Sequence, residues 1–306
     1  MIKEFKAGTK IDRILLVRLQ KIGNSSNGAA FARGLAEDNS GCIPFICFEA
    51  GTVDKLRAVT APKPFRITGA VDINKFAGDM SLQLIVQKIQ EVLPSDDVSH
   101  LMPKGDFDLE ECEEKLQTQI GKIKDKGIRE LVAYVLSGET YRQFKVNPAG
   151  MRLHHAYVGG LLQHSVAVAE LAEAIAEKTK GANKDLILAG ALLHDVGKLK
   201  EISSEMGFPY TTEGRLLGHI TMTAIIVNEA AARFDNIDDI VLQQLLHIIV
   251  SHHGEQEKGS PIACATKESF IVHYADEIDA IMNQFKENGE PAAWEFNKML
   301  QRFIYS

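Results

Sequence analysis

The sequence predicts a multidomain α+β protein, with a β-rich N-terminal domain over residues 1–93 and an all-α domain over 108–306. Up to residue 93, short runs of β-branched and aliphatic residues alternate with turn signals. Beyond residue 107, apolar residues recur with the 3.6-residue period of helices almost to the end of the chain. Between these parts, residues 94–107 are rich in Pro, Gly and Asp, which predicts a linker.

The first domain is expected to form five strands, with one helix after the third. This order of elements is typical of a small Greek-key barrel of the OB type, and a small β-sandwich or another barrel is the alternative. The expected strands cover residues 13–20, 29–37, 42–48, 63–73 and 81–92, and the helix covers 52–59.

Aromatic and basic residues in this domain suggest a nucleic-acid interface, because OB barrels bind single strands by stacking bases on exposed rings along a basic groove. Alternation alone does not decide which rings line such a groove and which fill the barrel. Phe48, Arg18, Lys21 and Lys63 lie nearby in the sequence. The candidate contacts are Phe31, Arg33, Phe45, Phe65 and Arg66.

The charge distribution favours the same interpretation, although weakly. Residues 1–93 carry 13 basic and 9 acidic side chains, whereas the whole chain has a net charge of −7. A mildly basic unit beside an acidic body fits a polyanion-binding module. No apolar run approaches the ~18 residues that span a bilayer, so we expect no membrane segment. The four scattered cysteines predict free thiols in a cytoplasmic protein.

The central feature of the second domain is the apolar stretch 188–198, which is expected to form a helix with the adjacent pair His194 and Asp195 near its end. Burial of both side chains without partners would cost several kcal/mol. A divalent cation removes this cost, because neutral imidazole and carboxylate are the ligands that it binds. Gly197 and Lys198 follow within one turn.

Further histidines and aspartates lie on four other expected helices, over about 160–178, 214–234, 238–252 and 270–285. A single buried histidine is more often an ordinary core residue than a ligand. Here, however, nine of the ten histidines fall between residues 154 and 273. Helical bundles build metal sites from side chains on several facing helices. The candidate ligands are His164, His194, Asp195, His219, His252, His253 and Asp276.

The order His, His-Asp, His, His, Asp, with Leu-Leu-His-Asp-Val-Gly-Lys at its centre, resembles the HD-domain superfamily of metal-dependent phosphohydrolases over about residues 150–285. The motifs Gly-Gly-Leu-Leu-x-His, Gly-Arg-Leu-Leu-Gly-His and Ser-His-His-Gly, placed after an OB barrel, resemble the YhaM-type 3′→5′ exoribonucleases. The resemblance implies an OB barrel followed by an all-α HD-domain bundle.

The resemblance also implies two metal ions. The residues implied for the first ion are His164, His194, Asp195 and Asp276. Asp195 would bridge to the second ion, whose remaining ligands are implied to be His219 with His252, His253 or both. Mixed imidazole and carboxylate ligands favour Mn²⁺, Fe²⁺ or Co²⁺ over Mg²⁺.

Asp195 and Lys198 are the expected catalytic residues. Two bridged cations lower the pKa of a bound water and orient in-line attack on a phosphodiester. Lys198 can then reach a phosphate oxygen, although a solvated lysine at a helix end is the alternative. His154, His155 and Arg215 are candidate substrate contacts.

The leading functional hypothesis is a metal-dependent 3′→5′ exonuclease that acts on single-stranded RNA or DNA. The first alternative is a phosphohydrolase of small or cyclic nucleotides. The second is a single-strand binder without activity, whose metals are structural, and the most remote is a di-iron oxygenase. The expected partner is single-stranded nucleic acid, and we also consider an oligomer of identical chains.

Overall fold

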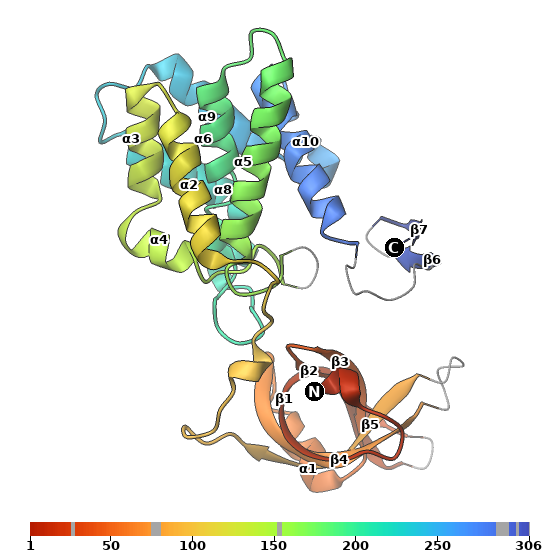
Figure 1. The fold of residues 1–306 in the computed structure, drawn as a ribbon. Coiled ribbons are helices and arrows are strands. Elements are labelled where there is room, and N and C mark those ends of the chain that lie inside the picture. The colour runs from red at the N-terminus through yellow and green to blue at the C-terminus, as the bar shows by residue number, and fades with distance from the viewer. Residues whose placement is uncertain (26–27, 75–80, 152–154, 286–293, 298–299, 306) are drawn as a thin grey trace. The chain divides into compact units, whose positions relative to one another are not determined.

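The computed structural model describes residues 1–25, 28–74, 81–151, 155–285, 294–297 and 300–305 (Figure 1). The chain divides into two compact units. The first contains Met1–Lys104 and Glu205–Pro209, and the second contains Gly105–Ser204 and Tyr210–Ser306. The division after Lys104 lies inside the predicted linker, whereas the short return of the chain to the first unit at Glu205–Pro209 has no counterpart in the sequence analysis.

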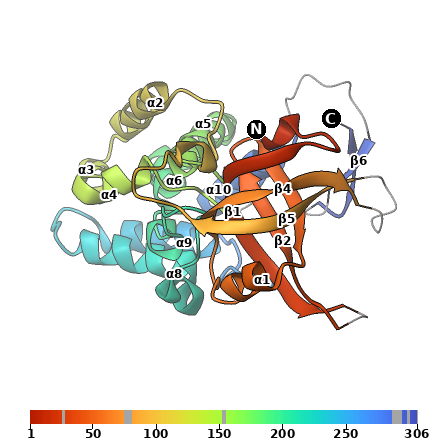
Figure 2. The same cartoon turned by 90° about the horizontal axis from the view of Figure 1, so that it is seen from below.

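The first unit is a closed five-stranded barrel with the strand order β1-β2-β3-β5-β4. The β3 and β5 strands are parallel, and the other neighbouring strands are antiparallel. This topology confirms the predicted OB-like barrel. Helix α1 packs against β2 and β5 at one end of the barrel (Figure 2). The elements are β1 (Lys10–Asn24), β2 (Ala30–Asp38), β3 (Gly41–Cys47), α1 (Ala50–Leu56), β4 (Lys63–Ile73) and β5 (Leu82–Glu91).

Strand alternation decides which aromatic rings fill the barrel. Successive residues of a strand point to opposite faces, and in β2, β3 and β4 alternate residues are buried. Phe45 is 1% exposed and Phe65 is 3% exposed, so both rings belong to the barrel core. Their predicted role as nucleic-acid contacts is therefore wrong.

The second unit is a helical bundle organised around α6 (Lys184–Leu193), which packs against α3, α5, α9 and α10. Every residue from 186 to 193 is buried, which explains why this helix is apolar on all sides. The predicted helical domain is thereby confirmed. The other long helices are α2 (Leu109–Lys122), α3 (Lys126–Val135), α5 (Gly160–Lys178), α8 (Thr212–Ala231), α9 (Asp239–Ser251) and α10 (Lys267–Met282).

Three features of this unit differ from the sequence analysis. Two short helices, α4 (Gly138–Phe144) and α7 (Lys198–Glu201), were not expected. The chain also returns to strand structure in a hairpin of β6 (Trp294–Asn297) and β7 (Arg302–Tyr305), so the second unit is not entirely helical. Alternating aromatic residues in 294–297 and 302–305 are the signal for these strands. Among the described residues, no helix combines the length and apolar character needed to cross a membrane.

Candidate metal centre and nucleic-acid interface

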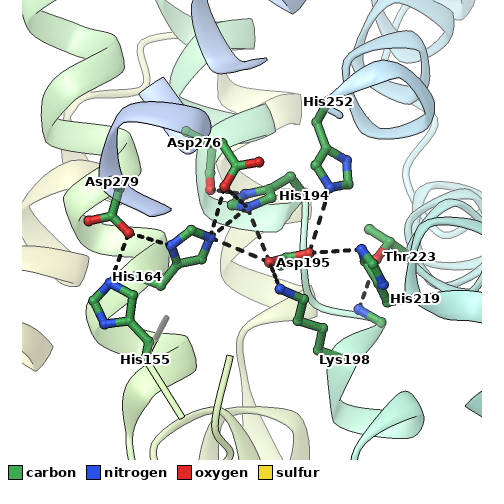
Figure 3. A network of polar contacts seen from close by, with 12 residues as sticks. His155, His164, His194, Asp195, Lys198, His219, Thr223, His252, Asp276 and Asp279 are labelled. Carbon is green, nitrogen blue, oxygen red and sulfur yellow. Dashed lines mark hydrogen bonds and ion pairs between the residues drawn. The ribbon is translucent and has the colours of Figure 1, made fainter. Parts of the chain in front are cut away.

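Five helices bring the predicted ligands together (Figure 3). His164 lies in the second turn of α5, and His194 and Asp195 directly follow α6. Helix α8 breaks at Gly218, whose φ of 71° is readily adopted only by glycine, and His219 begins its second part. His252 and His253 directly follow α9, and Asp276 lies on α10.

The first cluster of ligand atoms consists of His164, His194 and Asp276, which could hold a metal ion together. The two histidine Nε2 atoms are 3.1 Å apart. The Oδ1 atom of Asp276 lies 3.3 Å from the Nε2 atom of His164. Both histidines are fully buried.

The second cluster consists of His219, His252 and His253, and Asp195 lies between the two clusters. The Oδ2 atom of Asp195 is 3.4 Å from Nε2 of both His164 and His194 in the first cluster. Its Oδ1 atom is 3.4 Å from Nε2 of His219 and 3.7 Å from Nε2 of His252. Asp195 thus presents one oxygen to each cluster (Figure 3), as a carboxylate that bridges two metal ions would.

The orientation of the five imidazoles supports metal binding. Each Nδ1 atom is hydrogen-bonded to a protein oxygen, which leaves the Nε2 atom as the available ligand. For His194 and His252 the acceptor is the carbonyl of the residue three positions earlier, Ala191 and Ile249. The remaining acceptors are the carbonyl of Lys258 for His253 and the carboxylates of Asp279 for His164 and Glu201 for His219.

Unpartnered buried atoms test whether these residues fit a cation. The Oδ1 atom of Asp195 and the Nε2 atoms of His219 and His252 are buried without a hydrogen-bond partner. An unsatisfied buried polar atom costs about 1–3 kcal/mol. Because all three atoms approach each other and carry lone pairs, a divalent cation satisfies them together. The donor set of the second cluster therefore fits a metal ion.

The protonation states of several candidate ligands also favour the binding of a cation. Burial lowers the pKa of His252 and of His253, so both imidazoles are neutral, which is the form that binds metal. Burial alone would raise the pKa of Asp195, but Lys198 and neighbouring histidines hold it well below its usual range. Burial likewise lowers the pKa of His164, but three carboxylates outweigh it and raise this pKa well above its usual value. A bound cation would take the place of that proton.

A cavity of about 230 Å³ opens beside both clusters, and its lining includes Asp276 of the first and His253 of the second. Lys198 lines it, is 7% exposed, and places its Nζ 2.6 Å from Oδ2 of Asp195. The predicted catalytic pair Asp195 and Lys198 therefore faces the space in which a substrate would lie. The lining residues are Asp195, Lys198, His253, Lys258, His273, Asp276, Glu277 and Ala280.

Two of the three predicted substrate contacts, His155 and Arg215, are not among the residues that line this cavity. Both ring nitrogens of His155 are engaged by protein groups, Nδ1 by the Tyr157 hydroxyl and Nε2 by Asp279. The guanidinium of Arg215 lies over the ring of Tyr210, and Arg215 does not line the cavity. His154 lies outside the described residues. A substrate contact by any of these three residues remains a prediction.

The sequence analysis missed several residues that support the site. Glu201 and Asp279 hold ligand histidines, whereas Lys258 and Glu277 form an ion pair at 2.7 Å beside the cavity. A signal was available for Asp279, which lies three residues after Asp276 and thus on a similar face of α10. Nothing in the sequence pairs Glu201 with His219.

The close packing around position 197 explains why a glycine lies two residues after Asp195. A Cβ atom at this position would lie 2.2 Å from the carbonyl oxygen of His219 and 2.7 Å from the backbone nitrogen of Thr223. The backbone N–H of Gly197 also donates to the Thr223 hydroxyl. The close approach of α7 and α8, which places His219 near Asp195, therefore requires glycine here.

We expect Gly197→Ala to force α7 and α8 apart. Overpacking of this kind costs about 1–3 kcal/mol of folding free energy. Displacement of His219 by about 1 Å would lower the rate of hydrolysis roughly 10²-fold. Urea unfolding and a phosphodiesterase assay measure the two effects. The control is Gly121→Ala on α2, where nothing lies within 4 Å of the added methyl group, and unchanged behaviour of Gly197→Ala would contradict the expectation.

On the barrel, one outward-facing patch combines aromatic and basic side chains. Three of them are exposed and Phe31 is half-buried. We call Lys21, Phe31, Arg33 and Phe48 the β1–β3 patch. Phe48 is 51% exposed, and its ring centroid lies 6.4 Å from that of Phe31. Lys21 and Arg33 are exposed and directly opposite each other on β1 and β2. Like charges in this arrangement destabilise a sheet, whereas a bound polyanion would neutralise them.

The other predicted barrel contact, Arg66, differs from this patch. It is half-buried and forms ion pairs with Asp12 at 3.7 Å and with Asp96 at 3.2 Å. Its charge is therefore balanced within the barrel. Among the described residues, neither Lys21 nor Arg33 forms an ion pair, which makes them the stronger candidates for contact with phosphate.

Comparison with known families identifies the helical unit. Residues 161–281 match the family described as HD domain. This range begins just before His164 and ends after Asp276, so it contains all seven candidate metal ligands. The match confirms the predicted HD domain.

Two similar solved structures are those of the HD domain of the Listeria monocytogenes phosphodiesterase PgpH, one of them in complex with cyclic-di-AMP. Each shares 21% sequence identity with this chain, covers 49% of this chain and 76% of its own, and superimposes with a TM-score of 0.34.

The HD domain and the converging ligands define the class of protein. The chain contains an HD domain over residues 161–281, and its converging ligands are those of a metal-dependent phosphohydrolase. Its distinguishing feature is an OB-like barrel that precedes the HD domain in the same chain.

Proposed function

We propose that this enzyme is a 3′→5′ exonuclease that removes 5′-nucleotides from single-stranded RNA, with single-stranded DNA as a second substrate. The observation that carries this proposal is the β1–β3 patch on the barrel. A hydrolase of small nucleotides has no use for the exposed ring of Phe48 packed near the half-buried ring of Phe31, beside two cationic side chains that form no ion pair among the described residues. A single strand uses both, because its bases stack on the rings and its phosphates neutralise the cations.

The HD domain supplies the hydrolytic site of the proposal. The residues of the two clusters, with Asp195 between them, would hold divalent metal ions. Such ions, when bound, would supply positive charge for the phosphodiester and a more acidic water. The ligand set favours Mn²⁺, Fe²⁺ or Co²⁺. Asp195 keeps the negative charge that both positions need, because its pKa is held low.

Lys198 has the second role in the proposed reaction. Its ammonium group is almost fully buried, and Asp195 helps to keep its pKa raised, so it stays charged beside the cavity. A charged donor in such a water-poor place stabilises the negative charge that moves onto the phosphoryl oxygens in the transition state. Its ion pair with Asp195 fixes its position before substrate binds.

The direct test is digestion of a 5′-labelled, 20-nucleotide single-stranded RNA in the presence of Mn²⁺. We expect a ladder that shortens from the 3′ end, 5′-nucleotides as products, and no digestion when the 3′ end is blocked. A DNA strand of the same sequence and a cyclic dinucleotide serve as competing substrates. Faster turnover of the cyclic dinucleotide than of RNA would overturn the proposal.

Substitution in the β1–β3 patch separates strand binding from chemistry. Loss of one stacked base costs about 1–3 kcal/mol, so Phe48→Ala should raise the KM for RNA roughly 5- to 150-fold. Hydrolysis of the model diester bis(p-nitrophenyl) phosphate should not change. The matched control is Leu93→Ala, which removes another exposed apolar side chain, 63% exposed, from the same unit. Equal effects of Phe48→Ala on both substrates would contradict the role of the patch.

A further inference from the structure

The two clusters of ligands share one unusual feature. Of the five metal-facing histidines, three are held at Nδ1 by backbone carbonyls and two by carboxylates. The two carboxylate-held histidines belong to different clusters. Asp279 holds His164 of the first cluster (Figure 3), and Glu201 holds His219 of the second.

Glu201 contacts His219 directly, through both the backbone and the ring of the histidine. The Oε1 atom of Glu201 accepts a hydrogen bond from the backbone N–H of His219 at 3.0 Å. The same oxygen lies 3.1 Å from Nδ1 of the His219 ring, to which it is also hydrogen-bonded. The second oxygen, Oε2, is 3.0 Å from the same ring nitrogen. Glu201 is 8% exposed, so little water competes for these bonds. The carboxylate therefore fixes both the start of the second part of α8 and the direction of the His219 ring.

Asp279 joins His164 to a chain of hydrogen-bonded side chains that runs through His155 and Tyr157. Its Oδ2 atom lies 2.6 Å from Nδ1 of His164 and 2.8 Å from Nε2 of His155. The Nδ1 atom of His155 bonds the Tyr157 hydroxyl at 2.6 Å, and this hydroxyl donates to the side-chain oxygen of Gln163. The atoms of His155, His164 and Asp279 could hold an ion by distance alone, but these hydrogen bonds already join them.

The backbone of His155 supports the same interpretation. His155 is 3% exposed and has a φ of 47°, a left-handed conformation that is uncommon for residues other than glycine. Its backbone N–H donates to the side chain of Asn283 at 2.9 Å. A residue remains in such a conformation only where its surroundings hold it there, as these contacts do. His155 therefore acts behind His164 by keeping Asp279 in place.

An ionised acceptor affects a ligand histidine more than a carbonyl does. Charge-assisted hydrogen bonds are roughly twice as strong as neutral ones. A carboxylate at Nδ1 also increases the electron density that the imidazole offers through Nε2, and loss of such a partner typically weakens metal binding about 10- to 100-fold. Each cluster has one histidine of this kind, so each position has its own determinant of affinity.

We propose that Asp279 and Glu201 are positioning residues that set the affinities of the two metal positions separately, Asp279 for the first cluster and Glu201 for the second. The inference rests on the two-metal centre of the proposed function, but it does not depend on the substrate. It implies that the enzyme can lose one ion and retain the other.

The test measures Mn²⁺ binding by titration calorimetry in two backgrounds. Asp276→Ala removes a ligand of the first cluster, and His252→Ala removes a ligand of the second, so each variant should retain one position. In the Asp276→Ala background, Glu201→Gln should weaken the remaining site about 10- to 100-fold, and Asp279→Asn should leave it unchanged. In the His252→Ala background, Asp279→Asn should weaken the remaining site about 10- to 100-fold, and Glu201→Gln should leave it unchanged.

Glu213→Gln is the matched control, because Glu213 is an exposed carboxylate on the same helix as His219. Thermal unfolding of each metal-free variant shows whether it is folded before titration. Equal losses at both positions, or no loss at either, would overturn the separate roles. Binding of fewer than two Mn²⁺ ions per wild-type chain would overturn the two-metal centre itself. If the losses of affinity are selective but the enzyme does not degrade RNA, this inference stands and the proposed exonuclease activity is refuted.

Discussion

Replacement of Asp195 by asparagine is expected to lower the rate of phosphodiester hydrolysis by roughly 10³-fold or more. The carboxylate presents one oxygen to each ligand cluster and pairs with Lys198 at 2.6 Å. Asparagine keeps the shape but supplies one oxygen, no charge, and an amide that cannot bind a cation. Loss of several kcal/mol of electrostatic stabilisation in the transition state gives a rate loss of this size.

Single-turnover release of 5′-nucleotides from labelled RNA measures this loss, and elemental analysis of the purified variant shows whether metal content falls with it. Asp235→Asn is the control, because Asp235 is an exposed aspartate on the same unit. An Asp195→Asn variant that binds two ions and works within tenfold of the wild-type rate would mean that Asp195 does not bridge the centre.

Removal of metal by a chelator is expected to have the second large effect, on activity and on stability together. Without a cation, the buried Oδ1 atom of Asp195 and the Nε2 atoms of His219 and His252 have no hydrogen-bond partner. A ligand present at about 1,000 times its Kd stabilises the folded state by about 4 kcal/mol. For a unit of this size, such a change should lower the Tm by about 10 °C.

Differential scanning calorimetry before and after dialysis against EDTA measures this shift. The transition of the helical unit should move and that of the barrel should not, which provides an internal control. Mn²⁺ or Co²⁺ should restore activity better than Mg²⁺, because the centre offers five imidazoles and Mg²⁺ prefers oxygen ligands. Full activity after removal of metal would contradict the predicted hydrolytic centre.

The chemistry of the centre was predictable from the sequence because metal ligands leave a local signal. His194 and Asp195 lie inside an apolar run where an unpartnered polar pair would be costly. His164, His219 and Asp276 each lie on a separate apolar helix, and the HD-domain match spans all of them. The doublet His252 and His253 was left open, and the structure places both rings in the second cluster.

Which aromatic side chains of the barrel are buried was not predictable from the sequence in the same way. Phe31 and Phe45 occur in similar strand patterns, yet only Phe45 enters the core. The direction of a side chain depends on the register of its strand, and the register of β1 against β2 shifts between Leu19 and Lys21. The outward-facing pair of Phe31, which is half-buried, and Phe48, which is exposed, was therefore revealed only by the folded barrel.

By itself, the sequence determined the order of the barrel strands and of the long helices, and the residue types that could bind metal in the second unit. These properties depend on local periodicity and on residue types that neighbouring residues already constrain. Only the tertiary structure decided that Asp195 faces both clusters, that Glu201 holds His219, and that Asp279 joins His155 to His164. Such contacts join side chains up to 124 positions apart, and no local pattern specifies them.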